Sequence, residues 1–366
     1  MPTKLIFALV ALFLLVAFPS FAELYTEWLW FGETGYQSVF LKSLVAKGVL
    51  GLAVFLPAFL VLFGNLRLAV KGPNRPYVVF PGGGDLQPLV LEQRHLGWLA
   101  IGVSVLLAFF IAGIASSQWL VALQFLEATP FGKADPIFGW DAGFYIFTLP
   151  FLDFARFALL AVVVLSLVGS TAAYVVSGQL SLEPDGLKVG PRPRRHLLIL
   201  ASGVFVLLAV GAYLDLPRLL TAQNGIVHGA AYVDVAVRIP VLWILMAVSV
   251  LAAGLSVYAA FSLTNWPVVA AIGGYLIVGV GGSGVAALLQ TLVVTPDEQV
   301  KENPYLRDNI AATRIAFDLV DVEERQVSGD ALLTLDDIAN NAETINNVRL
   351  WDHQPLLDTF SQIQEI

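Results

Sequence analysis

The sequence predicts an all-α membrane protein: a bundle of seven transmembrane helices with aromatic-rich outer loops and a helical, acidic extracytoplasmic tail. Of its 366 residues, 57% are hydrophobic and 13% are charged, whereas soluble proteins average about 45–50% and about 25%. A helix needs roughly 20 mainly apolar residues to cross a bilayer. Seven stretches of about that length are present, and because lipid cannot satisfy open backbone groups, they indicate helices.

These stretches place a transmembrane domain over residues 1–290. The predicted spans are 5–22, 47–63, 97–115, 151–176, 197–214, 239–261 and 266–289. The first also fits a cleavable signal peptide, because Lys4, an apolar run and Ser20-Phe21-Ala22 precede Glu23. Cleavage would leave six spans and the same orientation for everything that follows.

Basic residues crowd into alternate connections and set the predicted orientation. Segments 64–96 and 177–196 carry eight Lys or Arg, and together with Lys4 they mark the cytoplasmic side. The opposite connections hold fewer: Lys42, Lys133, Arg156, Arg218 and Arg238, with Lys47 at the membrane boundary. We therefore expect a multi-pass protein of the cell membrane with a cytoplasmic amino terminus, a tight cytoplasmic turn near Thr264-Asn265 and an extracytoplasmic tail.

The outer connections are rich in aromatic residues. Trp28 and Trp30 follow the first span, and segment 117–150 adds eight more rings, which is typical of the headgroup layer. Repeated Pro and Gly residues predict that this segment folds into a compact cap, with Gln118–Leu126 as a short interfacial helix. Aromatic segments precede spans two, four and six. The preference of aromatic rings for the membrane interface explains this pattern more simply than a degenerate threefold repeat of helix hairpins.

Residues 291–366 are predicted to begin an acidic extracytoplasmic domain. They hold fifteen Asp or Glu and five Lys or Arg, a balance of −10. Asn303-Pro304, Thr334-x-x-Asp337 and Pro355 predict three helix starts. The last helix carries an apolar stripe that runs to Ile366, so we expect it either to dock on this tail or to belong to a chain cut within a larger domain.

No residue pattern indicates catalysis, a cofactor or a metal site. The chain has no cysteine, its four histidines are dispersed, and HExxH and GxSxG motifs are absent. A formal GxGxxG match at 279–284 lies inside a span, where its four glycines, together with Gly273 and Gly274, favour close helix packing instead. Asp135, Asp141 and Asp234 fit ordinary loop carboxylates better than ligands of a divalent cation. We expect neither enzyme activity in these residues nor nucleic-acid binding.

The middles of the seven spans contain no Asp, Glu, Lys, Arg or His. A charge at the bilayer centre costs at least about 2.5–3.5 kcal/mol and persists where it has a use. The pattern therefore argues against a proton-coupled pump or a path for charged substrates. Near the outer end of span four, Asp153 and Arg156 stand three residues apart and are predicted to pair on one helix face.

Several long runs resemble the bacterial uncharacterised protein family 0182. They are 25–40, 129–139, 303–305, 309–314 and 344–352, the last including Trp351. The resemblance covers essentially the whole chain and implies seven membrane helices followed by a large extracytoplasmic region. It supplies no established reaction, ligand or catalytic residue. Family members continue for several hundred residues beyond Ile366, so the resemblance leads us to expect an amino-terminal fragment.

The favoured interpretation is a membrane protein without enzyme activity that anchors and orients an extracytoplasmic domain, for envelope organisation or protein interaction. Its expected partners are the lipid bilayer and either envelope proteins or further copies of itself. One alternative is a transporter or channel for a neutral or lipidic substrate, which the glycines of span seven would permit. Another is a membrane-bound enzyme whose active site follows Ile366.

Overall fold

The computed structural model describes residues 3–71, 77–79, 89–91, 93–183, 186–224, 227–262, 264–323, 325–326, 329, 333–348 and 352–364. The long helices are α1 (Thr3–Glu33), α2 (Gln37–Val70), α3 (Gln93–Ser117), α5 (Leu149–Val176), α6 (Pro191–Arg218), α7 (Ile239–Phe261), α8 (Trp266–Leu289) and α9 (Glu298–Ala316). Shorter helices are α4 (Trp119–Leu126), α10 (Leu335–Asn340), α11 (Ala342–Asn347) and α12 (His353–Gln364).

Six helices are long and apolar enough to cross a membrane, which confirms six of the seven predicted spans as apolar helices. Over the described residues they are Gln37–Val70, Arg94–Ser117, Phe144–Val176, Pro191–Arg218, Asp234–Phe261 and Trp266–Ala316. The stretch predicted at 5–22 falls within α1, and its role as a span stays a prediction. The tight turn is also confirmed, since α7 ends at Phe261 and α8 begins at Trp266.

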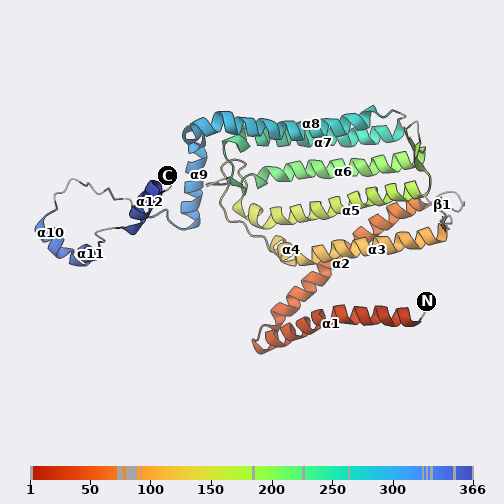
Figure 1. Ribbon diagram of the computed structural model, residues 1–366, viewed down its shortest axis with the longest axis horizontal. Helices are drawn as coiled ribbons and strands as arrows, with labels where there is room; N and C mark the ends of the chain where they lie inside the picture. The colour runs from red at the N-terminus through yellow and green to blue at the C-terminus, as the bar shows by residue number, and fades with distance from the viewer. Residues whose placement is uncertain are drawn as a thin grey trace. The chain divides into compact units, whose positions relative to one another are not determined.

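The six helices make their main contacts in series, in the order α3, α2, α5, α6, α7, α8 (Figure 1). We call the end at which α2, α5 and α7 finish the inner end, and the end at which α5 and α7 begin the outer end. The inner end is the predicted cytoplasmic side. In the most apolar stretch of each helix, only 11–33% of residues are buried, so most of the apolar surface faces outward.

Small side chains make the helix contacts. A cluster between α2, α3 and α5 contains Ala58, Leu62, Ala108, Ile111 and Val162. Buried serines lie along α3, α5, α6 and α7, and those at 104, 249 and 256 donate to the carbonyl four residues earlier. Without a hydrophobic driving force between helices in lipid, close approach of small residues supplies the attraction through van der Waals contact. These three serines satisfy their own hydroxyls within the helix.

Of the six glycines that the sequence assigns to packing in α8, two lie against a neighbouring helix. A Cβ at Gly282 would clash with a methyl of Val241, and one at Gly274 would touch Val248. The packing prediction is wrong for glycines 273, 279, 281 and 284, which have open space where a Cβ would stand.

Among the described residues, three π-helices occur at the outer end, and each is followed by a proline. They are η1 (Phe144–Thr148), η2 (Asp234–Arg238) and η3 (Gln290–Val294), and their prolines are Pro150, Pro240 and Pro296. A proline in a regular α-helix clashes with the carbonyl four residues earlier and cannot donate to it. Widening the preceding turn moves that carbonyl away, so we attribute the π-helices to the prolines.

The connections at the inner end contain β-hairpins, which the sequence analysis does not predict. β1 (Tyr77–Val79) pairs antiparallel with β2 (Leu89–Leu91), and β3 (Leu180–Glu183) pairs with β4 (Gly186–Val189). At the outer end, the short strands β5 (Gln223–Asn224) and β6 (Val227–His228) form a third pair between α6 and α7.

The chain divides into two compact units, Met1–Ala312 and Thr313–Ile366. The first includes most of α9, which follows α8 through η3 and the 3-10 turn η4 (Thr295–Asp297). The predicted helix start at Asn303-Pro304 is wrong, because α9 begins at Glu298 and contains Pro304 in its interior. In the second unit, Thr334 and Asp337 form the predicted capping box at the start of α10.

Candidate functional site

The outer loop between α4 and η1 is organised by two aspartates. Asp135 accepts hydrogen bonds from the backbone N–H groups of Ile137, Phe138 and Trp140 at 2.9, 2.6 and 2.7 Å, and from the Tyr145 hydroxyl at 2.9 Å. Asp141 accepts from the N–H groups of residues 131, 132 and 143 at 2.7–2.9 Å. These carboxylates fix the loop.

The same donors favour the charged form of both carboxylates. Burial raises the pKa of Asp135, but the N–H of Phe138, the Tyr145 hydroxyl and the other amides outweigh it and hold that pKa below its ordinary value. The backbone N–H groups of Phe131 and Gly143 are the main causes that lower the pKa of Asp141. A methyl at Gly143 would stand 2.5 Å from the Thr129 carbonyl oxygen, so the loop needs glycine there.

Aromatic rings fill the space behind this loop, as the predicted compact cap requires. The Trp140 ring has its centroid 4.8 Å from that of Phe144 and 6.2 Å from that of Tyr213 on α6. The predicted interfacial helix is present as α4. The loop is therefore held against the membrane helices by rings and from within by carboxylates.

Asp234 has a similar role at the start of η2. Its side chain is 2% exposed, accepts from the N–H of Ala231 at 2.8 Å and pairs with Arg238 at 2.7 Å. A carboxylate near a helix amino terminus is stabilised by the free N–H groups and the helix dipole. Asp234 thus links the loop after β6 to the helix that continues into α7.

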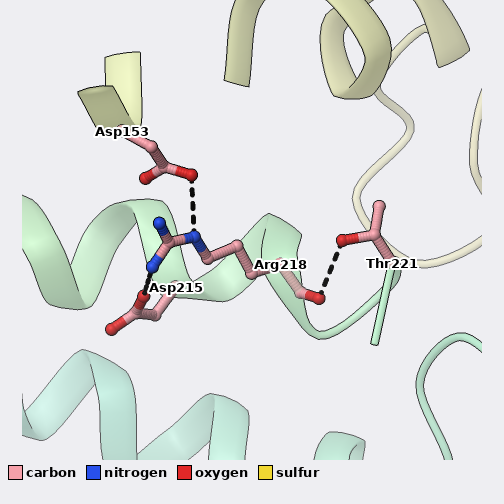
Figure 2. A network of polar contacts seen from close by, with 4 residues as sticks. All are labelled: Asp153, Asp215, Arg218 and Thr221. Atoms are coloured by element: carbon pink, nitrogen blue, oxygen red, sulfur yellow. Dashed lines mark hydrogen bonds and ion pairs between the residues drawn. The ribbon is translucent and has the colours of Figure 1, made fainter. Parts of the chain in front are cut away.

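Arg218 joins the outer ends of α5 and α6 (Figure 2). Its Nε donates to Asp153 on α5 at 2.7 Å, and its Nη1 donates to Asp215 at 2.8 Å. The Asp153 side chain is 16% exposed, and its second oxygen is buried without a hydrogen-bond partner. Thr221 donates its hydroxyl to the Arg218 carbonyl, which completes the end of α6.

The predicted pairing of Asp153 with Arg156 is wrong. Asp153 pairs with Arg218, which lies 65 residues further along the chain. The Arg156 guanidinium lies against α6, where a Cβ on Gly211 would stand 2.7 Å from Nη1. The glycine therefore makes room for a charged side chain between two helices, and the sequence separation hides both contacts.

A cavity of about 360 Å³ opens at the outer end between α6, α7 and α8. Asp215, Arg238, Ser283 and Gln290 contribute its polar lining, and the rest is mainly apolar: Leu219, Val233, Val241, Leu242, Gly282, Ala286 and Ala287. Asp215 and Arg238 are already engaged with Arg218 and Asp234. We call it the outer cavity; its charges are balanced, so it suits a neutral or amphipathic molecule better than an ion.

The inner end is held by cations on helix carboxyl termini. Arg192 donates to the carbonyl of Lys71 at 2.8 Å, at the end of α2. Arg194 donates to the Ala259 carbonyl at 3.1 Å and to the Asn265 side chain at 2.7 Å, at the end of α7. Cations there satisfy carbonyls that have no partner within the helix and oppose the negative end of its dipole.

His196 joins three helices at the inner end. Its Nδ1 lies 3.0 Å from the Tyr174 hydroxyl on α5, and its Nε2 lies 2.8 Å from the side-chain oxygen of Asn65 on α2. The neutral ring fits both contacts if Tyr174 donates and Nε2 carries the proton. The sequence alone does not indicate these contacts, because Tyr174 and Asn65 lie 22 and 131 residues from His196 in the chain.

The first half of α9 contacts the loop that leads into α7. Glu302 accepts from the N–H of Tyr232 at 3.0 Å, and the Asn309 side chain donates to the His228 carbonyl at 2.6 Å. The Lys301 ammonium stands 5.3 Å from the Tyr232 ring centroid. Below them, Val294 of η3 packs with Val233 and Ala286. We call Glu298–Ala312 the connector.

The remaining predicted positions have no shared site. Trp28 and Trp30 lie within α1, which continues to Glu33, and are 40% and 58% exposed. They were expected in a loop, but the helix extends past the apolar stretch. Trp351 lies outside the described residues. Among the residues that the structure describes, no group of three His, Cys, Asp or Glu side chains is placed to hold a metal ion.

Comparison with known proteins gives one consistent result. The family model described as "Uncharacterised protein family (UPF0182)" matches residues 4–366. A UPF0182 protein of Geobacter sp. strain M21 is 39% identical over 99% of this chain, and one of Pelobacter propionicus is 37% identical over 99%. The chain spans 41% of the length of each of these relatives. No solved structure matches.

Proposed function

We propose a function for this chain, which belongs to the uncharacterised protein family UPF0182. Its apolar helices anchor and orient the region that follows the connector, outside the cell membrane. The connector carries this proposal. It continues from α8 through η3 and η4, and it is tied to the loop before α7 by Glu302 and Asn309. A tether without a positioning role would need no such contacts.

The apolar contacts beside the connector support the same role. Val294 is fully buried against Val233 and Ala286, so η3 is fixed on η2 before α9 begins. Two successive constraints, one apolar and one polar, therefore determine the direction in which the chain leaves the membrane helices. Envelope proteins or further copies of the same chain are the partners that an oriented domain would serve.

Crosslinking in native membranes tests this proposal with the full-length protein. The double variant Glu302→Ala/Asn309→Ala removes two connector contacts, and Arg307→Ala on the same helix serves as the control. We expect wild type and control to capture the same partners, and the double variant to lose them at an unchanged membrane level. An unchanged set of crosslinks in the double variant contradicts the proposal, as does solute transport or substrate hydrolysis by the reconstituted protein.

The outer cavity favours one second candidate, a transporter for a neutral or lipidic substrate. Its mixed lining and position between three helices suit such a molecule. The unbroken α8 speaks against a path through that helix. Ser283→Trp should fill the cavity, so a transport activity in liposomes that this variant abolishes would replace anchoring as the main function. Equal permeability of vesicles with and without wild-type protein would exclude transport of the solute tested.

A further inference from the structure

A second cavity, of about 390 Å³, lies at the inner end between α2 and α3. Three cations line it: Arg67 and Lys71 one turn apart on α2, and Arg94 at the start of α3. Phe63, Gly97 and Trp98 are among its other lining residues. We call it the inner cavity. Among the described residues, its lining contains three positive charges and no carboxylate.

The cations of the inner end divide into two groups by what they contact. Arg192 and Arg194 donate to the ends of α2 and α7, and Arg195 stands 5.6 Å from the Phe261 ring centroid. In contrast, Arg67, Lys71 and Arg94 form no ion pair with any carboxylate that the structure describes. Arg67 is held 5.6 Å from the centroid of the Phe63 ring beside the cavity.

Three converging like charges repel one another unless an anion lies between them. The volume falls within the range of about 300–1,000 Å³ that is usual for small-molecule sites. The walls are partly apolar, and Trp98 is 64% exposed. A soluble anion would leave this apolar surface unused, whereas a lipid would cover it with its acyl chains.

We propose that the inner cavity binds the headgroup of an anionic phospholipid, with the phosphate between Arg67, Lys71 and Arg94. The acyl chains then run along the apolar surface beside Trp98. Basic pockets between membrane helices recognise anionic headgroups through charge and hydrogen bonds. This site is distinct from the outer cavity and from the connector, and it does not depend on the proposed anchoring function.

Lipid binding to the full-length protein, purified in a neutral detergent, tests the proposal. Thermal unfolding and native mass spectrometry are measured with phosphatidylglycerol, with phosphatidylcholine and with inorganic phosphate. The variant Arg67→Gln/Lys71→Gln/Arg94→Gln is compared with Lys42→Gln/Lys133→Gln/Arg307→Gln, which removes the same charge elsewhere. We expect phosphatidylglycerol to bind wild type and the control alike, and the cavity variant at least tenfold more weakly.

Three outcomes would overturn the proposal. The cavity variant could bind phosphatidylglycerol as wild type does, phosphatidylcholine could bind equally well, or inorganic phosphate could compete fully with the lipid and so identify a site for a free anion.

Gly97→Leu provides a second variant that keeps every charge. A Cβ at this position meets nothing within 4 Å, so the larger side chain has room and should occupy the cavity. We expect at least tenfold weaker binding of phosphatidylglycerol with an unchanged unfolding temperature in lipid-free detergent. Binding equal to wild type in this variant places the lipid elsewhere and contradicts the proposal, even if the triple variant does not fold.

Discussion

The two ends of the membrane helices are stabilised by opposite charges. At the inner end, the guanidinium groups of Arg192 and Arg194 donate to the carboxyl termini of α2 and α7. At the outer end, Asp141 accepts a hydrogen bond from the backbone N–H of Gly143 just before η1. Asp234 accepts one from the N–H of Ala231 just before η2. The same helix, α7, has a carboxylate at its beginning and a cation at its end.

Helix polarity explains this difference. Free N–H groups and the positive end of the dipole attract carboxylates, and free carbonyls attract cations. α2, α5 and α7 run in the same direction, so one end of the membrane domain collects their amino termini and the other their carboxyl termini. Part of the basic excess that predicts a cytoplasmic side therefore also caps helix ends.

Removing Arg218 should cause the largest loss of stability in this comparison. Arg218→Met leaves the Asp153 carboxylate, which is 16% exposed, without its cation. Loss of one partner of a buried pair costs about 3–5 kcal/mol, and the 41% exposure of Arg218 reduces our expectation to about 1–3 kcal/mol. Chemical unfolding in detergent measures it. Arg325→Met, in an exposed pair, is the control, and equal effects of the two would contradict the proposed importance of Arg218.

Arg194→Met should have a smaller effect, confined to the inner end. It removes donors to the Ala259 carbonyl and to the Thr264-Asn265 turn, and charged hydrogen bonds of this kind contribute about 1–2 kcal/mol when partly exposed. Hydrogen exchange should increase in residues 255–262 and stay unchanged in residues 129–145. Arg195→Met, which loses only a ring contact, should change little. Faster exchange throughout the chain would argue against a local cap.

Acid should loosen the outer end before the inner end. The folded pKa values of Asp135 and Asp141 lie below the ordinary 3.8, so these carboxylates stabilise the fold above pH 4, and the contribution is lost as pH falls through the lower folded values. Guanidinium groups at the inner end keep their charge. Exchange in residues 129–145 should rise below about pH 4. Asp135→Asn/Asp141→Asn should abolish that pH dependence, and a persistent rise in this variant would contradict our assignment.

Cysteine labelling tests which end faces the cytoplasm. The cysteine substitutions are expected to change the stability of the protein little. The chain contains no cysteine, so Lys133→Cys and Arg195→Cys each introduce one exposed thiol. In intact cells, a membrane-impermeant maleimide should label the first and not the second. Labelling of both after permeabilisation is the control. The reverse pattern in intact cells would invert the predicted orientation.

The helices were predictable because each apolar stretch is local in the sequence, and length alone decides whether it can span a bilayer. The capping box at Thr334 is local too, and it was found. The contacts of Arg218 with Asp153, of Arg194 with Ala259 and of His196 with Asn65 join residues 65 to 131 positions apart. No spacing within one helix identifies such partners, and the spacing of three residues points to the nearer Arg156 as the partner of Asp153 instead.

Some missed features did leave a signal. Pro150, Pro240 and Pro296 each follow an apolar or aromatic segment. In a continuous α-helix each proline would clash with the carbonyl four residues earlier, and this clash indicates the π-helix that precedes each of them. The inner cavity left a weaker signal. Arg67 and Lys71 stand four apart and so share a helix face, but only the pairing of α2 with α3 brings Arg94 beside them.

The serial order of helix contacts has a consequence for how the protein is made. α2 meets α3, α5 meets α6, α6 meets α7 and α7 meets α8, each a neighbour in the sequence, and among the main contacts α2 with α5 is the exception. Local contacts form quickly because little chain entropy is lost in closing short loops. Each helix can therefore find its neighbour soon after it enters the membrane, and assembly can proceed hairpin by hairpin in the order of synthesis.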